Sequence, residues 1–177
     1  MGEEKFVLSL LVNNEAGVLT RVSGLFSRRG FNIDSLSVEE TEDTHISRIT
    51  ITGTGDEYIK EQMVKQLEKL HDVKAVELMD LEKTVLRELL LIKISAQKGE
   101  YSEVMQAVSV FRAKVIDLNT KSLTLELTGD PPKINAFIQF LKPYGIVELC
   151  RTGVTAIGRG DYIVSQKTQN LGGNNNG

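Results

Sequence analysis

The sequence predicts an α+β protein made of two ferredoxin-like βαββαβ domains in succession. Three observations support this prediction. Short runs alternate apolar with polar residues, as strands with one buried face do. Other runs place apolar residues at helical spacing. The order strand, helix, strand, strand, helix, strand then occurs twice along the 177 residues. Two units of about 75 residues fit the split βαβ pattern, in which two helices cover one sheet face.

The first domain spans residues 1–80 and opens with a strand over 6–12, which Asn13, Asn14 and Gly17 interrupt. The following helix ends at Gly30, a typical C′ glycine. Two strands come next, separated by a polar turn at 42–44. These strands and the helix are marked by the apolar residues Phe6, Leu8, Leu10, Val12, Val18, Leu19, Val22, Leu25, Phe26, Leu36, Val38, Ile49 and Ile51.

A second helix follows Asp56, which is placed to cap it. One side of this helix presents Ile59, Met63, Leu67 and Leu70, and we expect Lys60, Glu61, Lys65 and Glu68 to face water. A strand over 73–80 closes the first domain.

The second domain spans residues 84–163, after a junction at 81–84, and repeats the same order. Leucines at 123, 125 and 127 alternate with polar residues, which predicts a strand. Asp130, Pro131 and Pro132 start a helix, because proline is tolerated in a first turn. A single strand over 146–155 is expected to close the domain. Its strands and helices are marked by the apolar residues Leu90, Ile92, Ile94, Val104, Ala107, Val108, Phe111, Ile116, Leu118, Ile134, Phe137, Ile138 and Leu141, of which the last four are expected to face inward.

Residues 164–177 are polar and rich in Gly and Asn. Such a segment has little apolar surface to bury, so we expect a disordered tail.

The first strand of each domain is apolar on both faces. Val7 and Leu11 oppose Leu8 and Leu10, and Leu89 and Leu91 repeat the arrangement in the second domain. This pattern favours an open sheet face that meets another subunit, so oligomerisation is predicted. The alternative is that the two domains cover each other.

Composition excludes several classes of protein. Lys and Arg total 21 against 24 Asp and Glu, a formal charge of −3, which disfavours general nucleic-acid binding. The single cysteine, Cys150, allows neither an intrachain disulfide nor a multi-cysteine metal site. No secretion signal or 18-residue apolar stretch is present, so we expect a cytoplasmic protein without membrane contact.

No set of residues resembles a catalytic, cofactor or metal site. His45 and His71 are expected on the surface, and Cys150 is expected as a small buried residue in its strand. Acidic pairs such as Glu39 with Glu40 fall at a strand end, where solvation explains them. Neither of the glycine-rich phosphate-binding patterns, GxxxxGK[ST] and GxGxxG, occurs.

The turn from the first strand into the first helix, residues 13–19, has suitable chemistry for a zwitterion. Free backbone N–H groups at a helix start suit a carboxylate. Asn14 carries both a donor and an acceptor, and Gly17 allows close approach to the backbone. Alternatively, Asn14 caps the turn and Gly17 relaxes a tight corner. The equivalent turn at 97–101 lacks the pattern, so a ligand site is expected in the first domain.

The same turn carries a resemblance to a known family. The runs LLVNNEAGVLTRV at 10–22 and GLFSRRGFNIDSL at 24–36 resemble the ACT domain of acetolactate synthase small subunits. Further similarity covers 47–51, 87–93, 111–113, 151–153 and 158–161, so the resemblance extends over about residues 5–163.

The resemblance implies a non-catalytic regulatory subunit that activates a separate catalytic large subunit in branched-chain amino-acid synthesis. It implies feedback inhibition by a free branched-chain amino acid, most typically valine, bound where the ACT domains of a homodimer pair. Residues 1–80 would thus bind effector and dimerise. No cofactor is expected on this chain; the catalytic subunit would carry thiamine diphosphate, Mg and FAD. The effector contacts implied by position are Asn14, Gly17, Val18, Leu19, Asn32 and Ile33.

Three alternative functions make different demands on the sequence. A stand-alone two-domain ACT sensor acting on another protein is the closest alternative. RNA binding through a sheet of this fold would need stacking aromatics, and strands at 46–52 and 123–128 contain none. A small ferredoxin-like hydrolase of the acylphosphatase type would need an Arg in a phosphate cradle after the first strand, and the 13–17 turn has no Arg.

Overall fold

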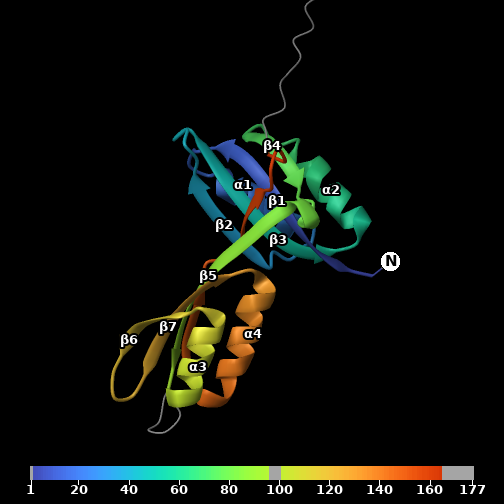
Figure 1. Ribbon diagram of the computed structural model, residues 1–177. Helices are drawn as coiled ribbons and strands as arrows, with labels where there is room; N and C mark the ends of the chain where they lie inside the picture. Colours follow the sequence, from blue (N-terminus) through green and yellow to red (C-terminus); the bar gives the residue numbers. More distant parts are fainter. Residues whose placement is uncertain (1, 96–100, 165–177) are drawn as a thin grey trace, which may run out of the picture. The chain divides into compact units, whose positions relative to one another are not determined.

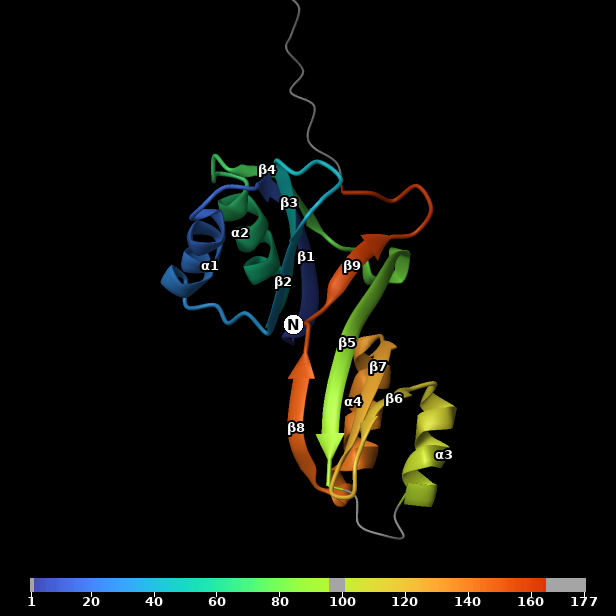
Figure 2. The same cartoon turned by 90° about the vertical axis from the view of Figure 1, so that its left-hand side faces the viewer.

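The computed structural model describes residues 2–95 and 101–164, which form two compact units. Among these residues the first unit takes 2–34, 38–83 and 158–164, and the second takes 35–37 and 84–157. Each unit has an antiparallel sheet with two helices on one face (Figures 1 and 2). The predicted fold class, two ferredoxin-like βαββαβ domains, is confirmed. The expected tail at 164–177 and the turn at 97–101 lie almost wholly outside the described residues.

The sheet of the first unit has the strand order β2-β3-β1-β4. Its core forms between this sheet and the two helices, where Leu8 pairs with Ile51 and Leu10 with Ile49, all at most 1 % exposed. The elements are β1 (Glu4–Asn13), α1 (Val18–Arg28), β2 (Ser35–Glu40), β3 (Ile46–Gly55), α2 (Glu57–Leu67) and β4 (Val73–Leu78).

The end of α1 and the start of α2 form at the residues that the sequence predicts. Gly30 has φ +70° and follows the cap of α1, and its N–H donates to Ser27 O while the Phe31 N–H donates to Phe26 O. This pair of bonds is a Schellman motif, which satisfies carbonyls left free at the helix end. Asp56 caps α2 by accepting a bond from the Ile59 N–H at 2.9 Å.

Lys60 departs from its predicted place in water. It is 9 % exposed, and its ammonium lies 3.1 Å from a Glu4 carboxylate oxygen and 3.5 Å from one of Glu57. The hydrogen bond to Glu4 raises the pKa of Lys60. A long apolar stem can cover core surface while its charged end reaches a partner, so helical periodicity alone did not predict this burial.

The second unit follows a short 3-10 turn, η1 (Leu81–Lys83), and its strand order is β6-β7-β5-β8, with β9 also pairing with β5. Leu90, Ile92 and Ile94 pack with residues of both helices in one core. The elements are β5 (Thr84–Ile94), α3 (Tyr101–Phe111), β6 (Lys114–Leu118), β7 (Leu123–Gly129), α4 (Pro131–Leu141), η2 (Lys142–Tyr144), β8 (Ile146–Arg151) and β9 (Thr155–Gly158).

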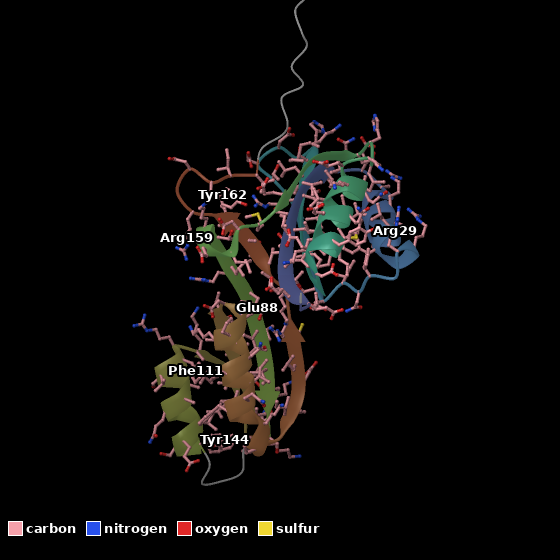
Figure 3. The ribbon with its side chains drawn as sticks, turned by 90° about the vertical axis from the view of Figure 1, so that its right-hand side faces the viewer. Arg29, Glu88, Phe111, Tyr144, Arg159 and Tyr162 are labelled. Carbon is pink, nitrogen blue, oxygen red and sulfur yellow. The ribbon has the colours of Figure 1, made fainter. Side chains whose placement is uncertain are left out.

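A buried ion pair joins β5 to β8 in this unit. Glu88, labelled in Figure 3, is 3 % exposed and accepts hydrogen bonds from Nε and Nη2 of Arg151. Arg151 also donates from Nη1 to the Asn135 carboxamide oxygen on α4 at 3.1 Å. One arginine therefore links two strands to the helix that covers them.

Two predictions about the end of this unit are wrong. The single strand expected over 146–155 is broken, because Gly153 takes φ +81° and separates β8 from β9. Cys150 is exposed rather than buried. It lies on β8, the edge strand, on the sheet face that the helices do not cover, where it pairs with Leu91.

After β9 the chain returns to the first unit. The Arg159 N–H donates to Lys83 O at 2.7 Å. The hydroxyl of Tyr162, labelled in Figure 3, accepts from the Asp80 N–H and donates to Glu77, each at 3.1 Å. Burial raises the pKa of Tyr162. The structural division at 157–158 therefore differs from the sequence-based limit at 163.

Candidate functional site

The turn between β1 and α1 is fixed by backbone hydrogen bonds on both sides. The Asn13 N–H donates to Asp72 O at 2.8 Å, and the Asn14 N–H donates to His45 O at 2.7 Å. Gly17 then caps α1 with φ +85°, a conformation that favours glycine. The β2–β3 turn and the segment before β4 therefore hold this turn at one end of the sheet.

The start of α1 offers donors to a ligand. The hydrogen bonds of the described residues leave the N–H groups of Leu19 and Thr20 without an acceptor, whereas the Val18 N–H donates to Glu15 O at 3.3 Å. No acidic residue occupies the first turn of the helix. Free donors combined with the positive end of a helix dipole suit a carboxylate.

The Asn14 side chain is exposed, and part of its hydrogen-bonding capacity is already used. Its Nδ2 donates to Thr44 O at 2.8 Å. This bond orients the carboxamide and leaves the carbonyl oxygen and one N–H for other partners. The sequence predicted a donor and an acceptor here, and the structure adds that one donor braces the β2–β3 turn.

Arg21 and Asp72 border the turn, and neither was predicted. Arg21 Nε lies 2.7 Å from Asp72 Oδ2, and a Cβ built on Gly17 would lie 3.1 Å from Arg21 Nη1. The spacing of Arg21, one helical turn after Gly17, could have indicated its proximity. Nothing in the sequence points to Asp72, which lies 51 residues further along the chain.

The six residues that the resemblance implies as effector contacts fall into two groups. Asn14, Gly17, Val18 and Leu19 gather at the start of α1; Val18 is buried at 3 % and Leu19 is 40 % exposed. Asn32 and Ile33 follow the other end of this 11-residue helix, which is about 16 Å long. The exposed Asn32 donates to Asp34 Oδ1 at 3.1 Å. A single chain therefore does not bring the two groups together.

Both histidines of the chain are on the surface. His71 is 93 % exposed, and His45 is also on the surface, as predicted. Within residues 2–95 and 101–164, no group of three or more His, Cys, Asp or Glu could hold a metal ion. None of the helices in these ranges combines the length and apolar character needed to cross a bilayer.

Two family models match the two halves of the chain. The first, described as the AHAS small subunit-like ACT domain, matches residues 8–75. The second, described as the small subunit of acetolactate synthase, matches residues 87–160. The first unit, which carries the exposed helix-start turn, is therefore an ACT-like domain of a two-domain α+β protein.

Relatives of similar length share the sequence. A probable acetolactate synthase small subunit of Methanothermobacter thermautotrophicus is 45% identical over 161 residues, covering 90% of this chain and 96% of that protein. The acetolactate synthase small subunit of Mycolicibacterium smegmatis is 46% identical over 159 residues, covering 90% of this chain and 94% of that protein. This chain belongs to the family of acetolactate synthase small subunits.

A solved structure supports the same assignment. The crystal structure of the small subunit from Thermotoga maritima matches with a TM-score of 0.82 at 38% identity, covering 90% of this chain and 99% of that one. The resemblance stated from the sequence is therefore confirmed.

Proposed function

We propose that this chain is the regulatory subunit of an acetolactate synthase, that it activates the catalytic large subunit, and that it confers feedback inhibition by a branched-chain amino acid. The observation that carries the proposal is the match of both halves to acetolactate synthase small subunits. The open helix-start turn in the half that matches an ACT domain supports amino-acid sensing.

The proposed effector site needs two copies of the chain. Because Asn14 and Asn32 lie at opposite ends of α1, two chains paired through their first units with antiparallel α1 helices bring Asn14 of one beside Asn32 of the other. The amino-acid carboxylate then meets the N–H groups near Leu19. Its ammonium meets the Asn14 carbonyl oxygen, and Ile33 adds apolar contact.

Valine is the effector we propose. A ligand of about eight heavy atoms binds with roughly −4 to −8 kcal/mol. Allosteric coupling typically requires about 1–3 kcal/mol, which such a ligand can supply if it prefers one dimer geometry.

The chemistry of the reaction is assigned to the partner. In this proposal the catalytic subunit holds thiamine diphosphate, Mg and FAD, and this chain is a non-catalytic cytoplasmic protein that holds no cofactor. Its net charge of −3 supports partners other than nucleic acid.

The test is an acetolactate synthase assay of the catalytic subunit with and without this chain, over a valine titration. The expected result is higher activity on addition of the chain and valine inhibition only in its presence. Unchanged activity and no valine response, with a catalytic subunit from the same organism, would contradict the proposal. Leucine and isoleucine titrations identify the preferred effector.

A further inference from the structure

The second unit exposes an apolar edge strand, β6, at the outer end of its sheet (Figure 1). All five of its residues, Lys114 to Leu118, are exposed. Val115, Ile116 and Leu118 are 37 %, 49 % and 61 % exposed. An exposed, apolar sheet edge is a template for pairing with another strand.

A β-bulge gives this edge an unusual charge pattern. Lys114 pairs with Glu126 and Val115 with Leu125, but Asp117 then pairs with Thr124, so Ile116 is an extra residue. Side chains alternate between faces in a regular strand, and the extra residue shifts that alternation. Lys114 and Asp117 consequently share the face that carries Glu126 and Thr124.

The face that carries Lys114, Asp117 and Glu126 is the sheet face opposite the helices. Leu125 and Leu127 lie in the core at 0 % and 1 % exposure, so Glu126 between them points to the uncovered side. Lys114 already lies 3.2 Å from Glu126 there. Val115 and Leu118, which pair with Leu125 and Leu123, lie on the helix-covered side.

The edge is therefore complementary to a second copy of itself. Two β6 strands can pair antiparallel about a two-fold axis perpendicular to the sheet, which keeps the same faces together. In the register that sets Lys114 opposite Asp117, both Lys114–Asp117 pairs lie on the uncovered face. Two Lys–Asp pairs then flank two Val115–Ile116 pairs.

We propose that β6 is an interface between copies of this chain, in which Lys114 of each copy pairs with Asp117 of the other. Opposite charges and β-branched residues placed directly across strands both favour pairing. The contact lies in the second unit and does not use the turn at residues 13–19.

Disulfide trapping tests the register. In a Cys150→Ser background, the double variant Lys114→Cys/Asp117→Cys would form a covalent dimer under oxidised glutathione, because cross-strand Cα distances of about 4.5–5.5 Å fit a disulfide. Within one chain these positions are about 9–10 Å apart, too far for an internal bond.

Single variants provide the register control. Lys114→Cys alone and Asp117→Cys alone should remain uncross-linked, since identical positions lie about 10 Å apart in this register. An equimolar mixture of the two single variants should give the covalent dimer. Cross-linking of either single variant, or none in the double variant and the mixture, would overturn the proposal.

A matched pair of edge substitutions tests the contact without cysteines. Leu118→Lys on β6 and Val147→Lys on β8 each place a charge at a residue 61 % exposed on an edge strand of this sheet. Sedimentation should show self-association weakened about tenfold by Leu118→Lys. Val147→Lys should leave it unchanged, and equal effects of both would refute the β6 interface.

Charge reversal tests the pairing of Lys114 with Asp117. Asp117→Lys should weaken association, because two lysines then oppose each other, and Lys114→Asp added to it should restore association. Failure of the double variant to recover would contradict the Lys–Asp pairing. The valine response of each variant, measured separately, shows whether the regulatory proposal holds independently of this contact.

Discussion

Gly17 combines two requirements at a single position. Its φ of +85° disfavours any residue with a Cβ, and an added Cβ would lie 3.1 Å from Arg21 Nη1. Both conditions favour glycine at this position, and glycine leaves the start of α1 uncovered by a side chain. A side chain here would occupy the place proposed for the effector carboxylate.

Gly17→Asp should therefore abolish feedback inhibition and leave activation of the catalytic subunit largely intact. A carboxylate side chain at the helix start competes with the effector, so the valine concentration for half inhibition should rise at least about tenfold. Titration calorimetry with valine checks the site. Gly145→Asp is the control, since Gly145 has a similar φ of +76° in the second unit; unchanged valine binding by Gly17→Asp would show the assigned site to be wrong.

Arg112 is the non-glycine residue with positive φ, +57°, among the described residues. It follows the end of α3, where its N–H donates to Ser109 O and the Ala113 N–H donates to Val108 O. Arg112→Gly should stabilise the chain by about 1 kcal/mol, because glycine adopts this conformation without a Cβ penalty. Urea denaturation measures the change. Arg112→Ala, which retains the Cβ, should not give it.

Sequence reasoning at this scale succeeded where one residue type has one local role. Asp56 and Asp130 cap α2 and α4 as predicted, and Gly30 ends α1. It failed for Lys60 and Cys150, whose environments depend on partners distant in sequence. Lys60 is buried through Glu4, 56 residues away, and Cys150 is exposed because its strand has an edge position that periodicity does not reveal.

At the scale of elements, the Glu88–Arg151 pair is the main polar link between β5, β8 and α4. The Glu88 side chain is 2% exposed and that of Arg151 is 32% exposed. Removing one member of a buried pair leaves an uncompensated charge, which commonly costs about 3–5 kcal/mol.

Glu88→Ala should lower the free energy of unfolding by about 3 kcal/mol. This value is the lower end of the range of about 3–5 kcal/mol, because Arg151 is partly exposed. The double variant Glu88→Leu/Arg151→Met should recover most of this loss, since an apolar pair of similar size leaves no unpaired charge. Denaturation of both variants provides the measurement. A double variant no more stable than Glu88→Ala would indicate that packing around Asn135, rather than charge pairing, stabilises this region.

The helices and central strands of both units were predictable, because leucine and isoleucine periodicity defines them. The break between β8 and β9 was not, since Gly153 at φ +81° interrupts an otherwise continuous apolar pattern. The turn at residues 13–19 was predicted as a set of residue types. The bracing of Asn14 by Thr44 and the Arg21–Asp72 pair required the β2–β3 turn and β4 to be placed in space.

For the whole molecule, sensing is proposed for the first unit and a copy-to-copy contact for the second. Addition of valine should slow hydrogen exchange of backbone amides at Leu19 and Thr20, which have no acceptor in the described chain. Amides of α3 and β7 should exchange at unchanged rates. Mass-spectrometric hydrogen exchange with and without valine measures this difference, and protection centred on the second unit would contradict the proposed location of the effector.

The return of the chain after β9 also has a consequence during synthesis. Tyr162 bonds to Asp80, 82 residues earlier, and to Glu77, 85 residues earlier. At about 5–20 residues per second, the ribosome needs roughly 4–16 s to add the 82 residues after Asp80. During this time Glu77 on β4 lacks its tyrosine partner, because residues 84–157 of the second unit are synthesised before Tyr162.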